Sequence, residues 1–131
     1  MEPVWISRHI ALVLHGMQLK AFGGSDGVRD ITLLESALAK PQNLLAYGDP
    51  PPDIFDLAAA YAYGIARNHP FVDGNKRTAL VVSETFLVRN GHEPAMTEEE
   101  NYLTFYALAA GEITEKELAA WFRTHSLPLE D

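Results

Sequence analysis

The densest group of chemically useful side chains is the segment from His69 to Arg77, which reads His-Pro-Phe-Val-Asp-Gly-Asn-Lys-Arg. Helix-forming stretches lie on both sides of it, so the segment joins a helix C-terminus to a helix N-terminus. If Asn75 is the N-cap, Lys76 and Arg77 fall in the first helical turn, where free backbone amides already carry partial positive charge. Two cations there are unfavourable unless an anion binds. The segment therefore predicts a phosphate site, with Gly74 allowing a close backbone approach.

The same segment carries a proton acceptor and a metal ligand. Histidine is the side chain that most often moves protons at neutral pH, which makes His69 the candidate general base. Asp73 offers the hard oxygen atoms that Mg²⁺ prefers. Taken singly, His69 could complement the negative end of the preceding helix, and Asp73-Gly74 could be an ordinary turn. Together with the two cations, these groups supply the parts that phosphoryl or nucleotidyl transfer needs.

Composition sets the limits within which this site must work. The chain has 131 residues, of which 47% are hydrophobic, and a formal charge of −8, which fits one domain over residues 1–131. The absence of cysteine excludes disulfides, cysteine-ligated zinc and thiol nucleophiles, and fits a reducing compartment. The acidic balance argues against direct nucleic-acid binding. No N-terminal targeting signal is present and no apolar run approaches the roughly 20 residues that span a bilayer, so we expect a cytoplasmic protein without membrane contact.

Helix-start signals are frequent along the chain. A hydroxyl side chain followed three residues later by glutamate predicts a capping box at Thr32, Thr97 and Thr114. Asp53 is a further predicted N-cap, and Pro41 predicts a helix end at Lys40. Six helices are predicted, over residues 7–22, 33–40, 54–68, 76–90, 98–110 and 115–125. With at most a short flap hairpin near residues 27–31, the fold class is an all-α, compact, single-domain helical bundle.

Two of these helices are expected in the middle of the molecule. The helices at 54–68 and 76–90 are apolar nearly all round, which is typical of central elements. Small residues in the first of them, including Gly64, would let a neighbouring helix approach closely. Trp5, Trp121 and Phe122 are expected to seal the core near the chain ends. The loop that carries His69 then lies at one end of a central helix pair.

The segment from His69 to Arg77 resembles the Fic-domain signature of His, any residue, Phe, any residue, an acid, Gly or Ala, Asn, any residue and Arg. Its continuation through Thr78-Ala79-Leu80 looks like the death-on-curing (Doc) branch of that family. The resemblance extends over residues 27–41 upstream and 86–91 and 109–113 downstream. It implies a Fic/Doc-like all-helical fold and a toxin of a type II toxin–antitoxin pair.

Site roles follow from the resemblance residue by residue. It implies that His69 activates a target hydroxyl and that Asp73 holds Mg²⁺. Four residues would grip the phosphates of ATP: Gly74, Asn75, Lys76 and Arg77. Phe71 would anchor the loop in the core, and residues 23–32 would form a flap that positions the target peptide.

One departure from the wider signature separates two activities. Leu80 stands where Fic proteins carry a second arginine, and Lys76 replaces a small glycine. In the Doc branch, which shares both changes, the γ-phosphoryl group rather than AMP is transferred, so the resemblance implies phosphorylation of elongation factor Tu and translation arrest. Gly74 favours the alternative, a protein adenylyltransferase. A non-catalytic partner of an antitoxin is a third possibility.

Control is expected in trans. The sequence lacks the inhibitory string of Ser or Thr, three residues, Glu, then Gly or Asn that self-restrained Fic proteins carry. The resemblance therefore implies a Phd-like antitoxin whose C-terminal segment folds on binding. The N-terminal helix and the face around Arg29 are the candidate docking surfaces.

Overall fold

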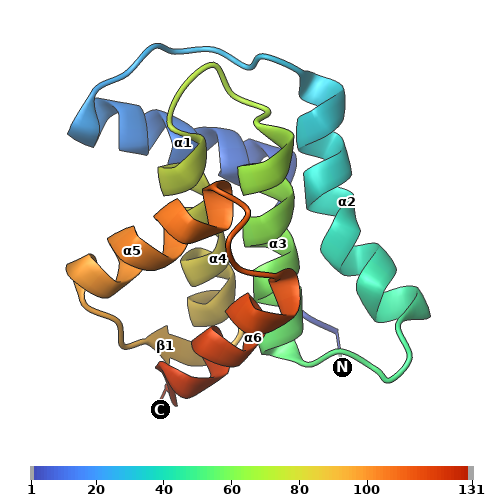
Figure 1. Ribbon diagram of the computed structural model, residues 1–131. Helices are drawn as coiled ribbons and strands as arrows, with labels where there is room; N and C mark the ends of the chain where they lie inside the picture. The colour runs from blue at the N-terminus through green and yellow to red at the C-terminus, as the bar shows by residue number, and fades with distance from the viewer. Residues whose placement is uncertain (1, 130–131) are drawn as a thin grey trace.

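The protein is described by a computed structural model that covers residues 2–129, so residues 1, 130 and 131 of the predicted domain lie outside the description (Figure 1). Six helices and two short strands occur in this range, and the predicted all-α bundle is confirmed. The elements are α1 (Arg8–Phe22), α2 (Ile31–Tyr47), α3 (Ile54–Asn68), α4 (Asn75–Arg89), β1 (His92–Pro94), α5 (Glu98–Ala109), α6 (Glu115–Thr124) and β2 (Ser126–Pro128).

Helices α3 and α4 form the centre of the molecule, as predicted. Figure 1 shows them side by side, with α1 crossing one end, α2 on one flank and α5 and α6 on the other. Most of α3 is buried, including Tyr61, which is fully enclosed. Gly64, however, faces α2 rather than α4: a Cβ atom there would lie 3.1 Å from the Ala37 Cβ. The small residue at this position therefore lets α2 pack closely.

The predicted helix caps at Asp53, Thr97 and Thr114 are confirmed, whereas the predicted cap at Thr32 is wrong. Capping boxes occur at Thr97, Thr114 and Asp53, where side chain and backbone satisfy each other. Helix α2 instead starts one residue after Asp30, whose carboxylate accepts the Leu33 N–H at 3.1 Å. Asp30 is fixed there because its own N–H donates to Pro70 O at 3.1 Å. The predicted Thr32 cap therefore lies inside the first turn.

The predicted end of α2 at Lys40 is also wrong, because the helix runs through Pro41 to Tyr47. A proline inside a helix removes one backbone hydrogen bond and crowds the preceding turn. Pro41 is itself buried, and Leu44 and Leu45 beyond it pack against the core. Packing of Pro41, Leu44 and Leu45 against the core outweighs the local penalty.

The small sheet was not predicted. Strands β1 and β2 pair antiparallel, with Glu93 opposite Leu127. Each strand is three residues long and contains a proline, so neither shows the alternating pattern that identifies strands. The pair ties the chain after α4 to the chain after α6.

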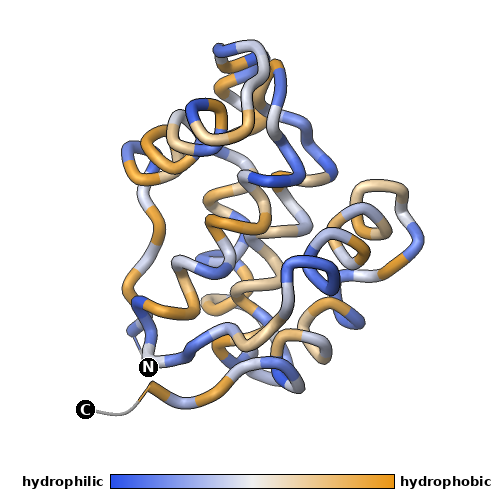
Figure 2. Tube along the Cα trace, turned by 90° about the vertical axis from the view of Figure 1, so that its left-hand side faces the viewer, coloured by the Kyte–Doolittle hydropathy of each residue, from blue (hydrophilic) through white to orange (hydrophobic). Residues whose placement is uncertain are grey.

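The distribution of apolar residues along the chain agrees with the packing of the helices around one core. Figure 2 shows hydrophobic residues recurring along the helices, whereas the connecting loops are mostly hydrophilic. The aromatic residues expected to seal the core do so: Phe122 is fully buried and Trp5 stacks on Phe86 at 6.0 Å between ring centroids. Between residues 2 and 129, no helix combines the length and hydropathy needed to cross a bilayer.

Candidate active site

His69 marks the end of α3 in an unusual backbone conformation. Its φ and ψ are 48° and 56°, the left-handed region that non-glycine residues rarely occupy. Arg29 fixes this turn, because its guanidinium donates to His69 O at 2.7 Å and to Asn68 O at 2.8 Å. Arg29 thus complements the negative end of α3, the role that His69 itself could have played. The His69 ring remains exposed and has no hydrogen-bond partner within residues 2–129.

The loop after His69 is anchored from inside. Phe71 is 1% exposed, which confirms its predicted burial. The Asn75 side chain holds the Phe71 backbone twice, because Oδ1 accepts from Phe71 N and Nδ2 donates to Phe71 O, both at 3.0 Å. The sequence had suggested Asn75 as the N-cap of α4, but its side chain does not cap this helix. That position belongs to Gly74, with φ +77° and no side-chain cap.

The segment between α1 and α2 lies beside this loop, as predicted for the flap. It forms no hairpin of its own, and instead Val28 pairs with Phe71 through an isolated antiparallel bridge. Val72 N donates to Gly27 O at 3.0 Å, which continues the pairing. At Gly24, a Cβ atom would lie 2.8 Å from Asp73 Oδ2, so a glycine is needed for this close approach.

One open pocket gathers every predicted site residue. It has a volume of about 480 Å³ and lies at the N-terminus of α4. His69 and the residues from Val72 to Arg77 line one side. Tyr106 and Ala109 of α5, together with Ala110 just after this helix, line the other side, and no pattern in the sequence pointed to Tyr106. The structure therefore brings the histidine, the carboxylate and both cations to one cavity.

The two cations of the pocket are held by aromatic rings rather than by acids. Lys76 Nζ lies 4.8 Å from the centroid of the Tyr106 ring, and the Arg77 guanidinium lies 3.9 Å from that of Phe22. Neither cation has a carboxylate partner among residues 2–129. In this described range, the backbone N–H groups of residues 75–77 are also unpaired. This end of α4 is therefore strongly positive in a chain of net charge −8.

The Asp73 carboxylate oxygens are of the kind that Mg²⁺ prefers as ligands. Its Oδ1 accepts from Gly74 N at 2.8 Å and its Oδ2 from Ser25 N at 3.2 Å, and each oxygen keeps a free lone pair. In the described part of the chain, no three His, Asp or Glu residues cluster as a metal site. Mg²⁺ in nucleotide sites commonly uses one or two carboxylates together with phosphate oxygens and water, so a single aspartate is compatible with it.

Leu80 contributes no charge to the pocket. It lies one turn beyond Arg77 and is partly buried against the core. The position that carries a second arginine in the wider Fic signature is therefore part of the hydrophobic packing in this chain.

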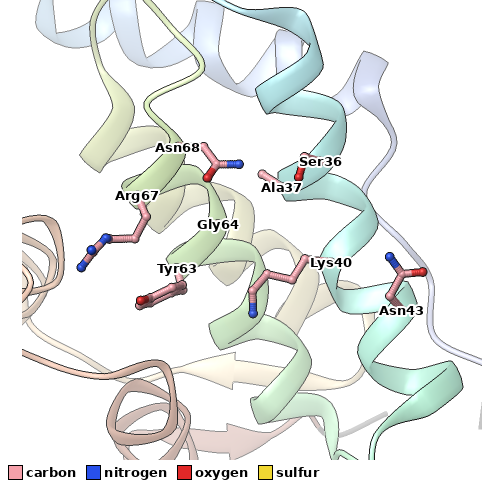
Figure 3. A pocket seen from close by; sticks show the side chains of 8 residues that line it. All are labelled: Ser36, Ala37, Lys40, Asn43, Tyr63, Gly64, Arg67 and Asn68. Carbon is pink, nitrogen blue, oxygen red and sulfur yellow. The ribbon is translucent and has the colours of Figure 1, made fainter.

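A second pocket of about 370 Å³ lies between α2 and α3 (Figure 3). Lys40 and Arg67 each lie 5.5 Å from the centroid of the Tyr63 ring, and Lys40 also contacts Glu115. No residue of the segment from His69 to Arg77 lines this pocket. It is therefore separate from the cavity that holds the predicted site residues.

The fold and the site together define a helical domain that presents a histidine, a carboxylate and an uncapped, cationic helix N-terminus to one cavity. The sequence profile described as the Fic/DOC family matches residues 5–87 of the chain. The chain belongs to the Fic/DOC family, and its relatives place it in the Doc branch.

Three relatives illustrate the similarity. "Toxin Doc" of Mycolicibacterium smegmatis is 51% identical over 71 residues, which cover 54% of this chain and about half (55%) of that toxin. "Protein kinase doc" of Escherichia phage P1 is 36% identical over 120 residues, 88% of this chain and 94% of the kinase. "Protein adenylyltransferase Fic" of Drosophila persimilis is 39% identical over 49 residues, 37% of this chain and 10% of that enzyme.

Proposed function

We propose that this chain is a Doc-type toxin that transfers the γ-phosphoryl group of ATP to a hydroxyl of a translation factor like elongation factor Tu, and so arrests translation. The observation that carries the proposal is the pocket in which His69, Asp73 and the cationic start of α4 meet. Similarity to a protein kinase over most of the chain supports it. Such a target places the activity in the cytoplasm.

Each group has a role in this reaction. His69 accepts the proton of the target hydroxyl, whose oxygen attacks the γ-phosphorus. The bond between the γ-phosphorus and the bridging oxygen breaks, and ADP leaves. Lys76, Arg77 and the free amides of residues 75–77 neutralise the phosphate charge. Asp73 would hold Mg²⁺, which supplies further charge neutralisation on the phosphates.

Adenylyl transfer is the second candidate. In that reaction the hydroxyl attacks the α-phosphorus, and diphosphate leaves. Gly74, the residue of the wider Fic signature, and the 49-residue similarity to an adenylyltransferase favour it. Leu80 argues against it, because the pocket lacks the second arginine at that position.

The proposed regulator is a Phd-like antitoxin. Helix α1 exposes Val13 and Met17, one turn apart on the same face, at 47% and 57% of their surface, and Phe22 at its C-terminal end at 59%. Arg29, the other residue considered for docking, already binds the carbonyls at the end of α3. An antitoxin segment that reaches the C-terminal end of α1 would lie next to the Arg77–Phe22 contact.

The test is the mass of the product. Purified protein, ATP, Mg²⁺ and elongation factor Tu are incubated, and the factor is analysed by intact-mass spectrometry. Addition of one phosphoryl group is expected. Addition of AMP would replace the kinase proposal by the adenylyltransferase, and an unmodified factor together with tight antitoxin binding would favour the non-catalytic alternative.

A further inference from the structure

Helix α1 inserts a buried histidine against the active-site loop. His15 is 3% exposed, and its ring stacks on Phe71 with 3.8 Å between centroids and 9° between planes. Its Nε2 lies 2.8 Å from Asp73 O. Because a carbonyl oxygen only accepts hydrogen bonds, Nε2 must carry the hydrogen and donate it. The segment from His69 to Arg77 does not contain this residue, which is 58 positions away from Asp73.

Two side chains therefore hold the loop, one from within it and one from α1. Asn75 binds the Phe71 backbone from within the loop, and His15 covers the Phe71 ring and binds Asp73 O from α1. Leu19, one turn after His15, adds a contact, since its Cδ2 lies 3.4 Å from the position of a Cβ on Gly74. The loop is fixed between these supports, although Asp73 itself is exposed.

The His15 hydrogen bond fixes the backbone that bears the Asp73 carboxylate. That backbone also carries the Gly74 N–H, which donates to Asp73 Oδ1 at 2.8 Å. The Asp73 carbonyl and the Gly74 N–H belong to the same peptide unit, so a rotation of this unit would displace both the carboxylate and the first residues of α4. No side chain caps this helix and would hold its start in place. A displacement of this kind in a reacting site is costly to the rate.

We propose that His15 is a positioning residue: its Nε2 hydrogen bond to Asp73 O sets the orientation of the Asp73 carboxylate toward the cation and nucleotide. The catalytic part of this proposal rests on the proposed function. The orientation of the loop does not depend on the proposed function, and it can be measured without an enzyme assay.

Two substitutions separate the hydrogen bond from the ring contact. His15→Gln keeps an N–H donor near the position of Nε2 but removes the stacked ring, whereas His15→Phe keeps a ring on Phe71 and removes the donor. We expect His15→Phe to raise the Mg²⁺ concentration for half-maximal transfer about tenfold and to lower kcat, as loss of a residue that orients a ligand does. KM for the target protein should stay unchanged, and His15→Gln should recover most of the activity.

His125→Phe is the matched control. The His125 ring also binds a backbone carbonyl at 2.8 Å, that of Trp121, but at the end of α6. The His125→Phe protein should be less stable than the unmodified protein, but its transfer reaction should show the same Mg²⁺ dependence. A His15→Phe enzyme with the Mg²⁺ dependence and kcat of the unmodified protein would overturn the proposal, as would a folded His15→Gln enzyme as impaired as His15→Phe.

Two measurements test the loop even if no transfer is found. Amide hydrogen exchange at Val72 and Gly74, whose N–H groups are hydrogen-bonded, should be faster in His15→Phe than in the unmodified protein and in His15→Gln. Equal rates in all three would contradict the proposal. In case His15→Phe does not fold, nitrogen NMR of the unmodified protein decides. A hydrogen on Nε2 of His15 is expected, and a ring with hydrogen on Nδ1 alone would rule the hydrogen bond out.

Discussion

The N-termini of α4 and α6 are built in opposite ways. Helix α6 starts with the capping box of Thr114 and Glu117, and its first turn also contains Glu115. Helix α4 starts at Gly74 without a side-chain cap, has no acid in its first turn and carries Lys76 and Arg77 there. The first arrangement satisfies the amides and the helix dipole and stabilises the fold. In α4 the backbone amides are uncapped and no acid balances the positive end of the helix dipole, which is what an anion-binding site requires.

Helix α4 tolerates this start because it is stabilised elsewhere. Ala79, Val82 and Phe86 are fully buried along its length. The preceding loop is held by Asn75 and His15 rather than by a cap. Tertiary packing therefore allows an electrostatically unfavourable helix start at the one place where a ligand is proposed to bind.

The largest expected effect is the loss of the proposed base. His69→Ala should lower the transfer rate by about 10²–10⁴-fold, the usual contribution of a general base. His9, which is exposed on α1 and lies outside the pocket, gives the control His9→Ala. The rate is measured from the mass adduct over time. A His69→Ala protein that remained as active as His9→Ala would remove His69 from its role.

Next in size is the loss of a cation at the start of α4. Arg77→Gln should weaken ATP binding by about 10–100-fold, because hydrogen bonds to charged groups contribute about 1.5–3 kcal/mol. Arg89→Gln, in the last turn of the same helix, should leave the affinity unchanged. Calorimetric titration with ATP measures both. Equal effects from the two variants would show that the general charge of α4, not its first turn, binds the nucleotide.

A smaller effect is expected at the capped helix. Thr114→Ala removes the hydrogen bond to Glu117 N, 3.0 Å long, and should lower the free energy of unfolding by about 1 kcal/mol. Chemical denaturation gives this value. ATP affinity should not change, and a loss of affinity in this variant would contradict the division between stabilising and binding helix starts.

The smallest effect concerns Glu84, further along α4. Burial raises the pKa of this carboxyl above its usual 4.5, an effect that the facing amide of Asn101 partly offsets. Folding thus favours the protonated form, so this group's contribution to stability is present at low pH and is lost as the pH rises through the raised value. Glu84→Gln should remove that part of the pH dependence and make the protein slightly more stable at neutral pH. Chemical denaturation of both proteins at a series of pH values from acid to neutral tests this. Unchanged ATP affinity in Glu84→Gln would again indicate that ATP binds at the first turn of α4.

Local rules predicted most of the fold correctly. The caps at Asp53, Thr97 and Thr114 were predicted because a capping box needs only residues three positions apart. The errors occurred where distant contacts override local preference. Asp30 caps α2 because Pro70 holds its backbone, and α2 passes Pro41 because Leu44 and Leu45 are packed against the core.

The candidate site shows the same division. Its chemical groups were predicted because they occupy nine consecutive residues, and all of them line one pocket. Asn75 was assigned to the wrong structural task, because its fit to the Phe71 backbone depends on the loop conformation. Tyr106 was missed because its position opposite Lys76 depends on how α5 packs against α4.

By itself, the sequence determined the helical class, the order of the helices and the kind of chemistry in the loop, because these follow from side-chain type and short spacing. Only the tertiary structure decided how the loop is held. Arg29 and His15 reach it from 40 and 58 residues away, and hydrogen bonds over such separations exist only when the helices have packed. The orientation of His69 and Asp73 is therefore a property of the folded molecule.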